Sequence, residues 1–333
     1  MNATRRRWLA AVLGVACWGI AGEARAQAPG GGGSERPGAP PAPGPTVTAP
    51  ASADDAGWPA GTLVIAGGGS LGDEIRQRAL SEAGGPQARV VVIPQASALA
   101  DAGERARSAW LEAGAADVAI LALEPAEAAE AAAQELTRAT LIWITGGDQN
   151  RLMEAIGKTD VPRLIRERYR AGAVIAGTSA GAAVMAEHMF TGQADLKSVS
   201  AAATETRPGL GLVDVLVDQH FHARGRFNRL LSAVLDRPDR LGIGIDEGTA
   251  IVVQGGGIEV IGRSSAMVID ARSARCSATP PGSPAAAEAV QLHLLRAGMR
   301  FELEARSAAA SRPKSPAEPA ESGNEAHPPR AKD

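Results

Sequence analysis

The sequence predicts an α/β fold in which a mostly parallel sheet is covered by helices on both faces. Short runs that are apolar along their whole length alternate with helical segments between residues 58 and 181. Strands of this kind are typical of parallel sheets that are buried on both sides. The segment 241–303 then brings several short strand-like runs close together, which adds a strand-rich C-terminal part with some antiparallel pairing.

The elements of the first part follow one another in a regular order. The run "TLVIAGGG" is typical of a strand that ends in glycines, and "DEIRQRALSEAG" of a helix that stops at Gly84. The strands are expected at 62–69, 89–94, 117–123, 140–147 and 173–181, and the helices at 73–84, 104–114, 125–139, 150–157 and 161–172. The later strand candidates are "GIGI", "AIVVQG", "IEVIG", "MVID" and "LHLLRAG".

The composition limits both the core and the partners. Of the 333 residues, 45% are hydrophobic but only 3% are aromatic, so the core must be built from Ala, Val, Leu and Ile. A formal net charge of −3 provides no general basic field for nucleic acid. No Cys/His spacing matches a metal site. We expect no metal, and the serine chemistry considered below needs no organic cofactor either.

The N-terminus resembles an export signal. A positive segment, Arg5–Arg7, precedes the apolar run "WLAAVLGVACWGIAG", and Ala24–Ala26 fits a cleavage site. We therefore expect residues 1–26 to be a signal peptide and the protein to be periplasmic or extracellular, without a stable membrane span after cleavage. The adjacent arginines also resemble a twin-arginine signal. A lipid anchor on Cys17 is less favoured, because Gly14 occupies the position where such sites usually have Leu.

Two segments are expected to lie outside the folded domain. Residues 27–57 are rich in Pro, Gly, Ala and Ser and predict a disordered linker, and 306–333 predict a disordered tail. The folded domain is then 58–305. Because Cys17 would leave with the signal, Cys276 remains alone and no intramolecular disulfide is expected.

Four expected strands end in glycine-rich or polar turns, "AGGGS", "IPQAS", "TGGDQN" and "AGTSAG". Ligands bind beyond the carboxyl ends of the strands in such sheets. In the last turn, Gly177 and Gly181 flank Ser179 in the G-x-S-x-G pattern that presents a nucleophile on a strained strand-to-helix turn. The Ala180 N–H would face an anion beside it. The same pattern occurs in close-packed turns and phosphate loops, so this motif alone leaves packing and catalysis open.

A nucleophilic serine needs a base, and the chain has five histidines. His220 is the expected base because it follows the apolar run "LVDVLV" at the end of a strand. We expect His188 to point away on the helix after the serine, and His293 to be structural. Either Asp246 or Glu247, after "GIGI", could orient the imidazole. The order serine, histidine, acid differs from that of α/β-hydrolases and argues against a lipase or esterase.

Two further groups are candidates for substrate contacts. In "TGGDQN", Gly147 allows close backbone approach, and its N–H could complete an oxyanion hole with that of Ala180. A tight turn or a helix cap explains the same glycine equally well. Three arginines follow His220, and beside a catalytic histidine they indicate recognition of a carboxylate, although a solvated helix face is the ordinary explanation. Few aromatic residues accompany them, so the pattern does not indicate nucleic-acid binding.

Together, "TGGDQNRL", "AGTSAGAAVM", "DQHFHARGRFNRL" and "GIGIDEGTA" resemble the motifs of the cyanophycinase family over about residues 60–305. These are serine peptidases related to dipeptidase E, with a fold similar to that of class I glutamine amidotransferases. The resemblance implies a three-layer sandwich and a triad of Ser179, His220 and Glu247. It also implies a homodimer, since family members often form one, and exported members fit the signal seen here.

Cyanophycinases cleave cyanophycin, a poly-aspartate backbone with arginine on each side-chain carboxyl, and release β-Asp-Arg dipeptides. The resemblance implies substrate binding by Gln149, Asp218, Gln219, Arg224, Arg226 and Arg229. In "RGRFNRL", Phe227-Asn228 replace a short residue and Gly that the family often has, which is expected to reshape the pocket.

The leading hypothesis is therefore an exported serine exopeptidase that hydrolyses cyanophycin through an acyl-enzyme on Ser179. Two alternatives stay open. An α-aspartyl or isoaspartyl dipeptidase would use the same residues on short peptides. A catalytically inactive protein would use the same pocket to bind an anionic or arginyl ligand.

Overall fold

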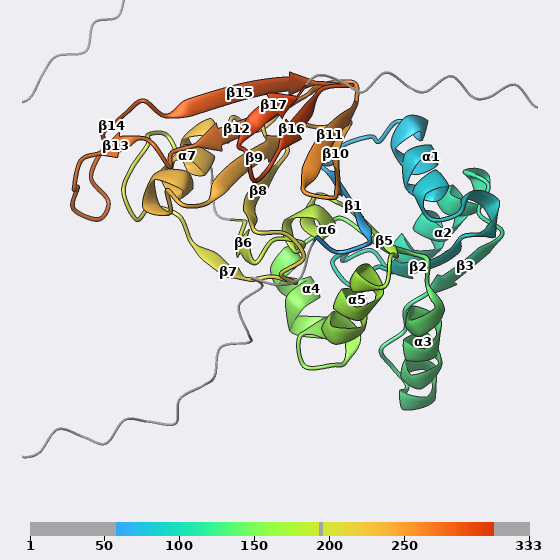
Figure 1. Ribbon diagram of the computed structural model, residues 1–333. Helices are drawn as coiled ribbons and strands as arrows, with labels where there is room; N and C mark the ends of the chain where they lie inside the picture. The colour runs from blue at the N-terminus through green and yellow to red at the C-terminus, as the bar shows by residue number, and fades with distance from the viewer. Residues whose placement is uncertain (1–57, 193–195, 310–333) are drawn as a thin grey trace, which may run out of the picture. The chain divides into compact units, whose positions relative to one another are not determined.

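The computed structural model describes residues 58–192 and 196–309. Its centre is a nine-stranded sheet with the order β17-β16-β11-β10-β1-β5-β4-β2-β3 (Figure 1). The strands β1, β5, β4, β2 and β3 are parallel to one another. The other four strands, β10, β11, β16 and β17, continue the sheet from β1, and each pairs antiparallel with the strand before it. Their bounds are β1 Thr62–Ala66, β2 Arg89–Ile93, β3 Asp117–Ile120, β4 Leu141–Ile144, β5 Val174–Thr178, β10 Thr249–Gln254, β11 Gly257–Gly262, β16 Arg300–Glu302 and β17 Ser307–Ala309.

A second sheet has four strands in the order β15-β12-β9-β8. Its bounds are β8 Val215–Gln219, β9 Leu241–Ile245, β12 Ser265–Asp270 and β15 Gln291–Arg296. Strands β8 and β9 are parallel and in register from Val215↔Leu241 to Gln219↔Ile245, so both deliver their carboxyl ends to the same edge. Two short hairpins complete the strands: β6 His188–Phe190 with β7 Thr206–Pro208, and β13 Arg275–Cys276 with β14 Ala287–Glu288.

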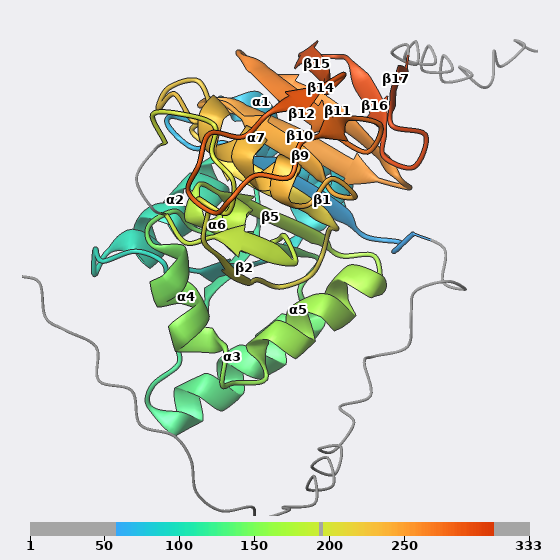
Figure 2. The ribbon, with the colours of Figure 1, turned by 90° about the vertical axis from the view of Figure 1, so that its left-hand side faces the viewer.

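Helices cover both faces of the large sheet because its strands alternate apolar side chains to either side. Val64 and Ala176 face a cluster that includes side chains of α1 and α2. Leu63 and Ile175 face α3 to α6 and the second sheet, whose other face packs on α7 (Figure 2). The bounds are α1 Asp73–Glu82, α2 Ala102–Glu112, α3 Ala126–Arg138, α4 Gln149–Ile156, α5 Val161–Arg170, α6 Ala180–Ala183 and α7 Phe227–Asp236. The predicted α/β fold with helices on both faces is confirmed.

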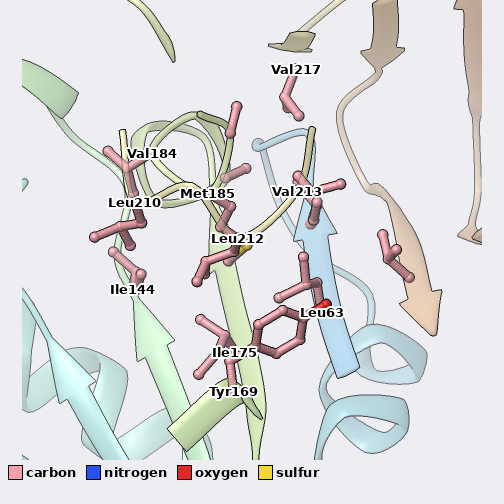
Figure 3. Close-up of a cluster of buried hydrophobic side chains, with 14 of the residues drawn as sticks. Leu63, Ile144, Tyr169, Ile175, Val184, Met185, Leu210, Leu212, Val213 and Val217 are labelled. Carbon is pink, nitrogen blue, oxygen red and sulfur yellow. The ribbon is translucent and has the colours of Figure 1, made fainter. Parts of the chain in front are cut away.

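The core between the large sheet and its neighbours is aliphatic, as the composition requires. Figure 3 shows Leu63 and Ile175 of neighbouring parallel strands beside Met185, Leu212 and the ring of Tyr169, and all five side chains are buried. Burying side chains of this size stabilises the fold by about 1.5–3 kcal/mol each. This packing fixes the position of β5, whose end carries Ser179.

The structure also corrects two details of the prediction. His188 lies in strand β6 rather than on the helix after Ser179, because α6 ends at Ala183. Strand β17 pairs with β16 inside the stretch that was expected to be tail. The predicted signal and linker (1–57) and the rest of that tail (310–333) lie outside the described residues. Within the described ranges, no helix has the length and hydropathy needed to cross a membrane.

Candidate active site

Ser179 occupies a sharp turn between β5 and α6. Its φ of 53° and ψ of −112° are rare for a residue other than glycine and typical of a nucleophile elbow. Its N–H donates to the Ala66 carbonyl at 3.1 Å. A Cβ on Gly177 would lie 2.6 Å from the Gly181 oxygen, and one on Gly181 would lie 2.2 Å from the Ile144 oxygen. The two glycines therefore allow the close packing that holds the serine at the edge of the sheet.

His220 and Glu247 reach this turn from the second sheet. His220 follows β8 directly, with a φ of 51°, and its N–H donates to the Gly67 carbonyl at 2.7 Å. Its Nε2 lies 2.8 Å from Ser179 Oγ, and its Nδ1 lies 2.5 Å from Oε1 of Glu247. Glu247 follows β9 closely. The parallel pairing of β8 and β9 thus brings the histidine and the carboxylate to one place.

The neighbouring carboxylate, Asp246, has different partners. Its Oδ1 accepts a hydrogen bond from the Ala223 N–H at 3.0 Å, and its Oδ2 accepts one from Ser264 Oγ at 3.0 Å. Of the two acids that the sequence left open, Glu247 is therefore the one that contacts the imidazole.

Burial lowers the pKa of the His220 imidazole. The charges of Arg224 and Arg226 lower this pKa further, whereas the hydrogen bond to Glu247 and its charge raise it. The result is a pKa below the ordinary 6.5, so the ring is neutral at pH 7. A carboxylate only accepts hydrogen bonds, so it selects the tautomer with the proton on Nδ1. The lone pair of Nε2 then faces the Ser179 hydroxyl, as a general base requires.

The glycine-rich loop after β1 packs against both the histidine and the acid. A Cβ on Gly68 would lie 2.3 Å from His220 Cε1, and one on Gly69 would lie 2.8 Å from Glu247 Oε2. The Gly68 carbonyl also accepts a hydrogen bond from the Gly248 N–H at 2.9 Å. Sequence reasoning placed "AGGGS" at the expected site but assigned no residue of it a role. The run of glycines was the one sequence signal for this close packing, because the residues that pack against it lie far along the chain.

The loop between β4 and α4 lies beside the serine. A Cβ on Gly146 would be 3.3 Å from Ser179 Cβ. Gly147 has a φ of 142°, and its Cβ would lie 2.1 Å from the Ala96 oxygen, so only glycine fits there. Ala180 is the first residue of α6, where an N–H has no acceptor within the helix. The oxyanion role of Gly147 and Ala180 stays a prediction.

Four of the six residues predicted to bind substrate pair with one another inside the protein. The buried Asp218 accepts hydrogen bonds from Arg229 Nε at 2.9 Å and from Nη2 at 2.5 Å. Arg226 donates to the main-chain carbonyl of Gln219 at 2.6 Å and to its side-chain oxygen. These pairs brace the end of β8 immediately before His220. Substrate contacts of the four residues stay a prediction.

The other two predicted residues differ in exposure. Gln149 is buried, and its Nε2 donates to the Phe190 carbonyl at 2.8 Å. Arg224 is exposed on the turn after the histidine, where a charged substrate can meet it. Asn228, at the departure from the family pattern, donates to the Leu196 carbonyl at 3.1 Å. Arg229 also borders a small hollow lined by Phe190, Thr191, Leu196, Ala203, Thr204 and Glu205.

The arrangement as a whole is suited to acyl transfer. A hydroxyl on a strained turn contacts a neutral imidazole, which a carboxylate orients from the other side. In the part of the chain that the structure describes, no three His, Cys, Asp or Glu side chains come together as a metal site would need. Cys276 is a free and exposed thiol on the β13–β14 hairpin.

Comparison with known proteins identifies the family to which the chain belongs. The model of peptidase family S51 matches residues 63–261. The chain is 42% identical over 231 residues to a cyanophycinase of Geminocystis herdmanii, which covers 68% of this chain and 84% of the relative. It is 38% identical over 245 residues to a cyanophycinase of Trichormus variabilis, and this match covers 71% of this chain and 82% of the relative.

A solved peptidase from an acI-B1 actinobacterium shares the fold. Its TM-score is 0.55 at 21% sequence identity, and the match covers 73% of this chain and 96% of that one. The family match spans Ser179, His220 and Glu247. The chain therefore belongs to peptidase family S51 and is a serine-type peptidase.

Proposed function

We propose that the protein is an exported exopeptidase that hydrolyses cyanophycin to β-Asp-Arg dipeptides through an acyl-enzyme on Ser179. The observation that carries the catalytic part is the continuous line of contacts from Ser179 Oγ through both ring nitrogens of His220 to Glu247, at 2.8 and 2.5 Å. The substrate is supported by the relatives, which are named cyanophycinases.

In the proposed reaction, Ser179 Oγ attacks the carbonyl carbon of a backbone amide while His220 Nε2 takes the hydroxyl proton. The N–H groups of Gly147 and Ala180 stabilise the resulting oxyanion. The imidazolium, held by Glu247, gives its proton to the departing amine as the C–N bond breaks and the ester forms. Water then attacks the ester with His220 as base, which releases the carboxylate and restores the serine.

The charges around the site suit the proposed substrate. Arg224 is exposed and is proposed to bind a substrate carboxylate, since a guanidinium matches that group with two hydrogen bonds. We propose that the buried pairs shape the rest of the pocket rather than meet the substrate as free charges. These pairs are Asp218 with Arg229 and Gln219 with Arg226, and we propose the same role for Gln149, which is bonded to the Phe190 carbonyl.

The masses of the products test the proposal most simply. Purified protein is incubated with cyanophycin, and separately with Asp-X and isoaspartyl dipeptides. We expect the β-Asp-Arg mass to appear with cyanophycin and to vanish with Ser179→Ala. Cleavage of the short peptides alone would favour a dipeptidase, and binding of cyanophycin without any product would favour an inactive binding protein. Release at the parent rate by Ser179→Ala would overturn the mechanism.

Export and assembly are separate parts of the proposal. The charged, apolar and small-residue segments of 1–26 support export. Fractionation of cells that express the full chain is expected to place the protein in the periplasm or medium, with an N-terminus after Ala26. Intact full-length protein in the cytoplasm would contradict this. The homodimer implied by the family resemblance is tested by light scattering during gel filtration.

A further inference from the structure

Asp246 connects three segments of the site without touching the reacting groups. Its backbone belongs to the turn that carries Glu247. Its Oδ1 holds the Ala223 N–H at 3.0 Å, on the turn that begins with His220. Its Oδ2 holds the Ser264 hydroxyl at 3.0 Å, on the turn before β12. One carboxylate thus joins the turn of the base, the turn of the acid and a third turn that supports both.

Two backbone hydrogen bonds anchor the start of the turn of the base. The His220 N–H donates to Gly67, and the Phe221 N–H donates to the Ile245 carbonyl at 3.2 Å. Beyond these two residues, the link from Ala223 to Asp246 holds the turn against the end of β9. The Asp246 N–H in turn donates to the Ser265 carbonyl at 3.3 Å, which fixes its own backbone. The position of the carboxylate is therefore defined from both sides.

The charge state of Asp246 agrees with this role. Burial alone would raise the pKa of its carboxyl group. Hydrogen bonds from the Ala223 and Glu247 N–H groups and from Ser264, together with the nearby His222, outweigh burial and lower the pKa below its ordinary value. The carboxyl group is therefore ionised at neutral pH, which suits the hydrogen bonds that it accepts from Ala223, Glu247 and Ser264.

We propose that Asp246 is a positioning residue that fixes the turn of His220 relative to Glu247 and so aims Nε2 at Ser179. The proposal rests on the proposed function, because the aim of the base matters only if the serine is the nucleophile. A displacement of about 1 Å at a reacting group can cost on the order of 100-fold in rate. Two hydrogen bonds at one residue can therefore control catalysis from outside the triad.

The test compares Asp246→Ala with Asp246→Asn. The alanine removes the hydrogen bonds to Ala223 and Ser264 together with that from the Glu247 N–H, and we expect kcat to fall about 10- to 100-fold with KM within about twofold. The asparagine can still accept from Ala223 and can donate to the Ser264 hydroxyl, so it should restore most of the lost kcat. The proton on His220 Nδ1 gives a downfield NMR signal, which we expect to shift or broaden in the alanine variant and to return in the asparagine variant.

Asp270→Ala is the matched control. Asp270 is a buried aspartate that, like the partly buried Asp246, accepts from a backbone N–H, that of Arg272 at 2.9 Å, and from a side chain, that of Arg306 at 2.7 Å. It lies at the opposite end of β12 from the site. We expect this variant to lose stability while kcat and the signal of His220 stay unchanged.

The outcomes separate this proposal from the proposed function. An unchanged kcat and NMR signal in Asp246→Ala, or equal losses of kcat in both alanine variants, would overturn the positioning role. If Asp246→Ala does not fold, Ser264→Ala removes the hydrogen bond between Ser264 and Asp246, and an unmoved signal of His220 in that variant would equally overturn the positioning role. Activity retained by Ser179→Ala would instead refute the proposed function.

Discussion

The two halves of the candidate site are built in different ways. Ser179 is presented by a local strand–turn–helix at the end of β5, in the parallel half of the large sheet. His220 and Glu247 come from β8 and β9 of a separate sheet, and only the register of those strands brings them together. The end of β1 and the loop after it touch both halves, because the Ala66 carbonyl accepts from the Ser179 N–H whereas Gly68 and Gly69 pack on His220 and Glu247. The nucleophile thus depends on local sequence, whereas its activation depends on segments that lie far apart.

The largest expected effect comes from removing the base. His220→Ala leaves the elbow intact but gives the Ser179 proton no acceptor, so kcat on cyanophycin should fall by about 10⁴- to 10⁶-fold. His293→Ala is the control, because His293 lies in β15 and its ring meets that of Phe301 edge to face, outside the triad. A loss of kcat that is equal in both variants would show that the second sheet contributes no base.

The buried pair behind the base should matter for stability. Asp218→Asn leaves Arg229 without its full charge partner, and we expect the free energy of unfolding to fall by about 3–5 kcal/mol. Glu288→Gln breaks the exposed pair with Arg275 and should cost less than about 1 kcal/mol. Urea unfolding measures both. Similar losses in the two variants would mean that the end of β8 is not braced by this pair.

Gly68→Ala tests the packing of the loop after β1 against the base. The new Cβ would lie 2.3 Å from the imidazole, so the ring must move and kcat should fall by about 100-fold. Gly84 is a matched control. Its φ of 102° is close to the 103° of Gly68, but a Cβ added to Gly84 would have no neighbouring atom within 4 Å. Gly84→Ala should therefore show only the backbone strain, as a lower melting temperature with unchanged kcat. Equal kcat values in the two variants would show that the loop does not position the imidazole of His220.

The smallest expected effect is on the pH dependence. Burial and nearby arginines lower the pKa of His220, so the neutral base persists into more acidic solution. Labelling of Ser179 by a neutral fluorophosphonate should accordingly fall with a midpoint below pH 6.5. Arg224→Ala removes a charge that lowers the pKa and should move the midpoint upward. The exposed Arg272→Ala should not move it. A wild-type midpoint above pH 6.5 would contradict the lowered pKa of His220.

The local half of the site was largely predictable from the sequence. An apolar run followed by "GTSAG" specifies a buried strand and a tight turn, because both depend on adjacent residues. The parallel strands were likewise found near their observed positions, such as 62–69 for Thr62–Ala66. The strand-rich part was expected, but its division into an outer half of the large sheet and a second sheet was not. That division depends on pairing between distant segments.

The remaining details depend on the direction of side chains. Asp246 and Glu247 are adjacent and chemically alike, yet they bond to different turns, which no pattern distinguishes. Asp218 and Arg229 are predicted substrate contacts, and the structure adds that they bond to each other, which no sequence pattern indicates. The role of Gly68 likewise depends on how near a distant imidazole comes.

The central claim is that His220 of the second sheet activates Ser179 of the first. Mass spectrometry after reaction with a fluorophosphonate tests it directly, with the modified peptide identified in wild type and in His220→Ala. We expect a single adduct, on Ser179, in folded wild-type protein, and almost none in the variant or in wild type unfolded by urea. An adduct on another residue, or equal labelling of Ser179 in the variant, would contradict the claim.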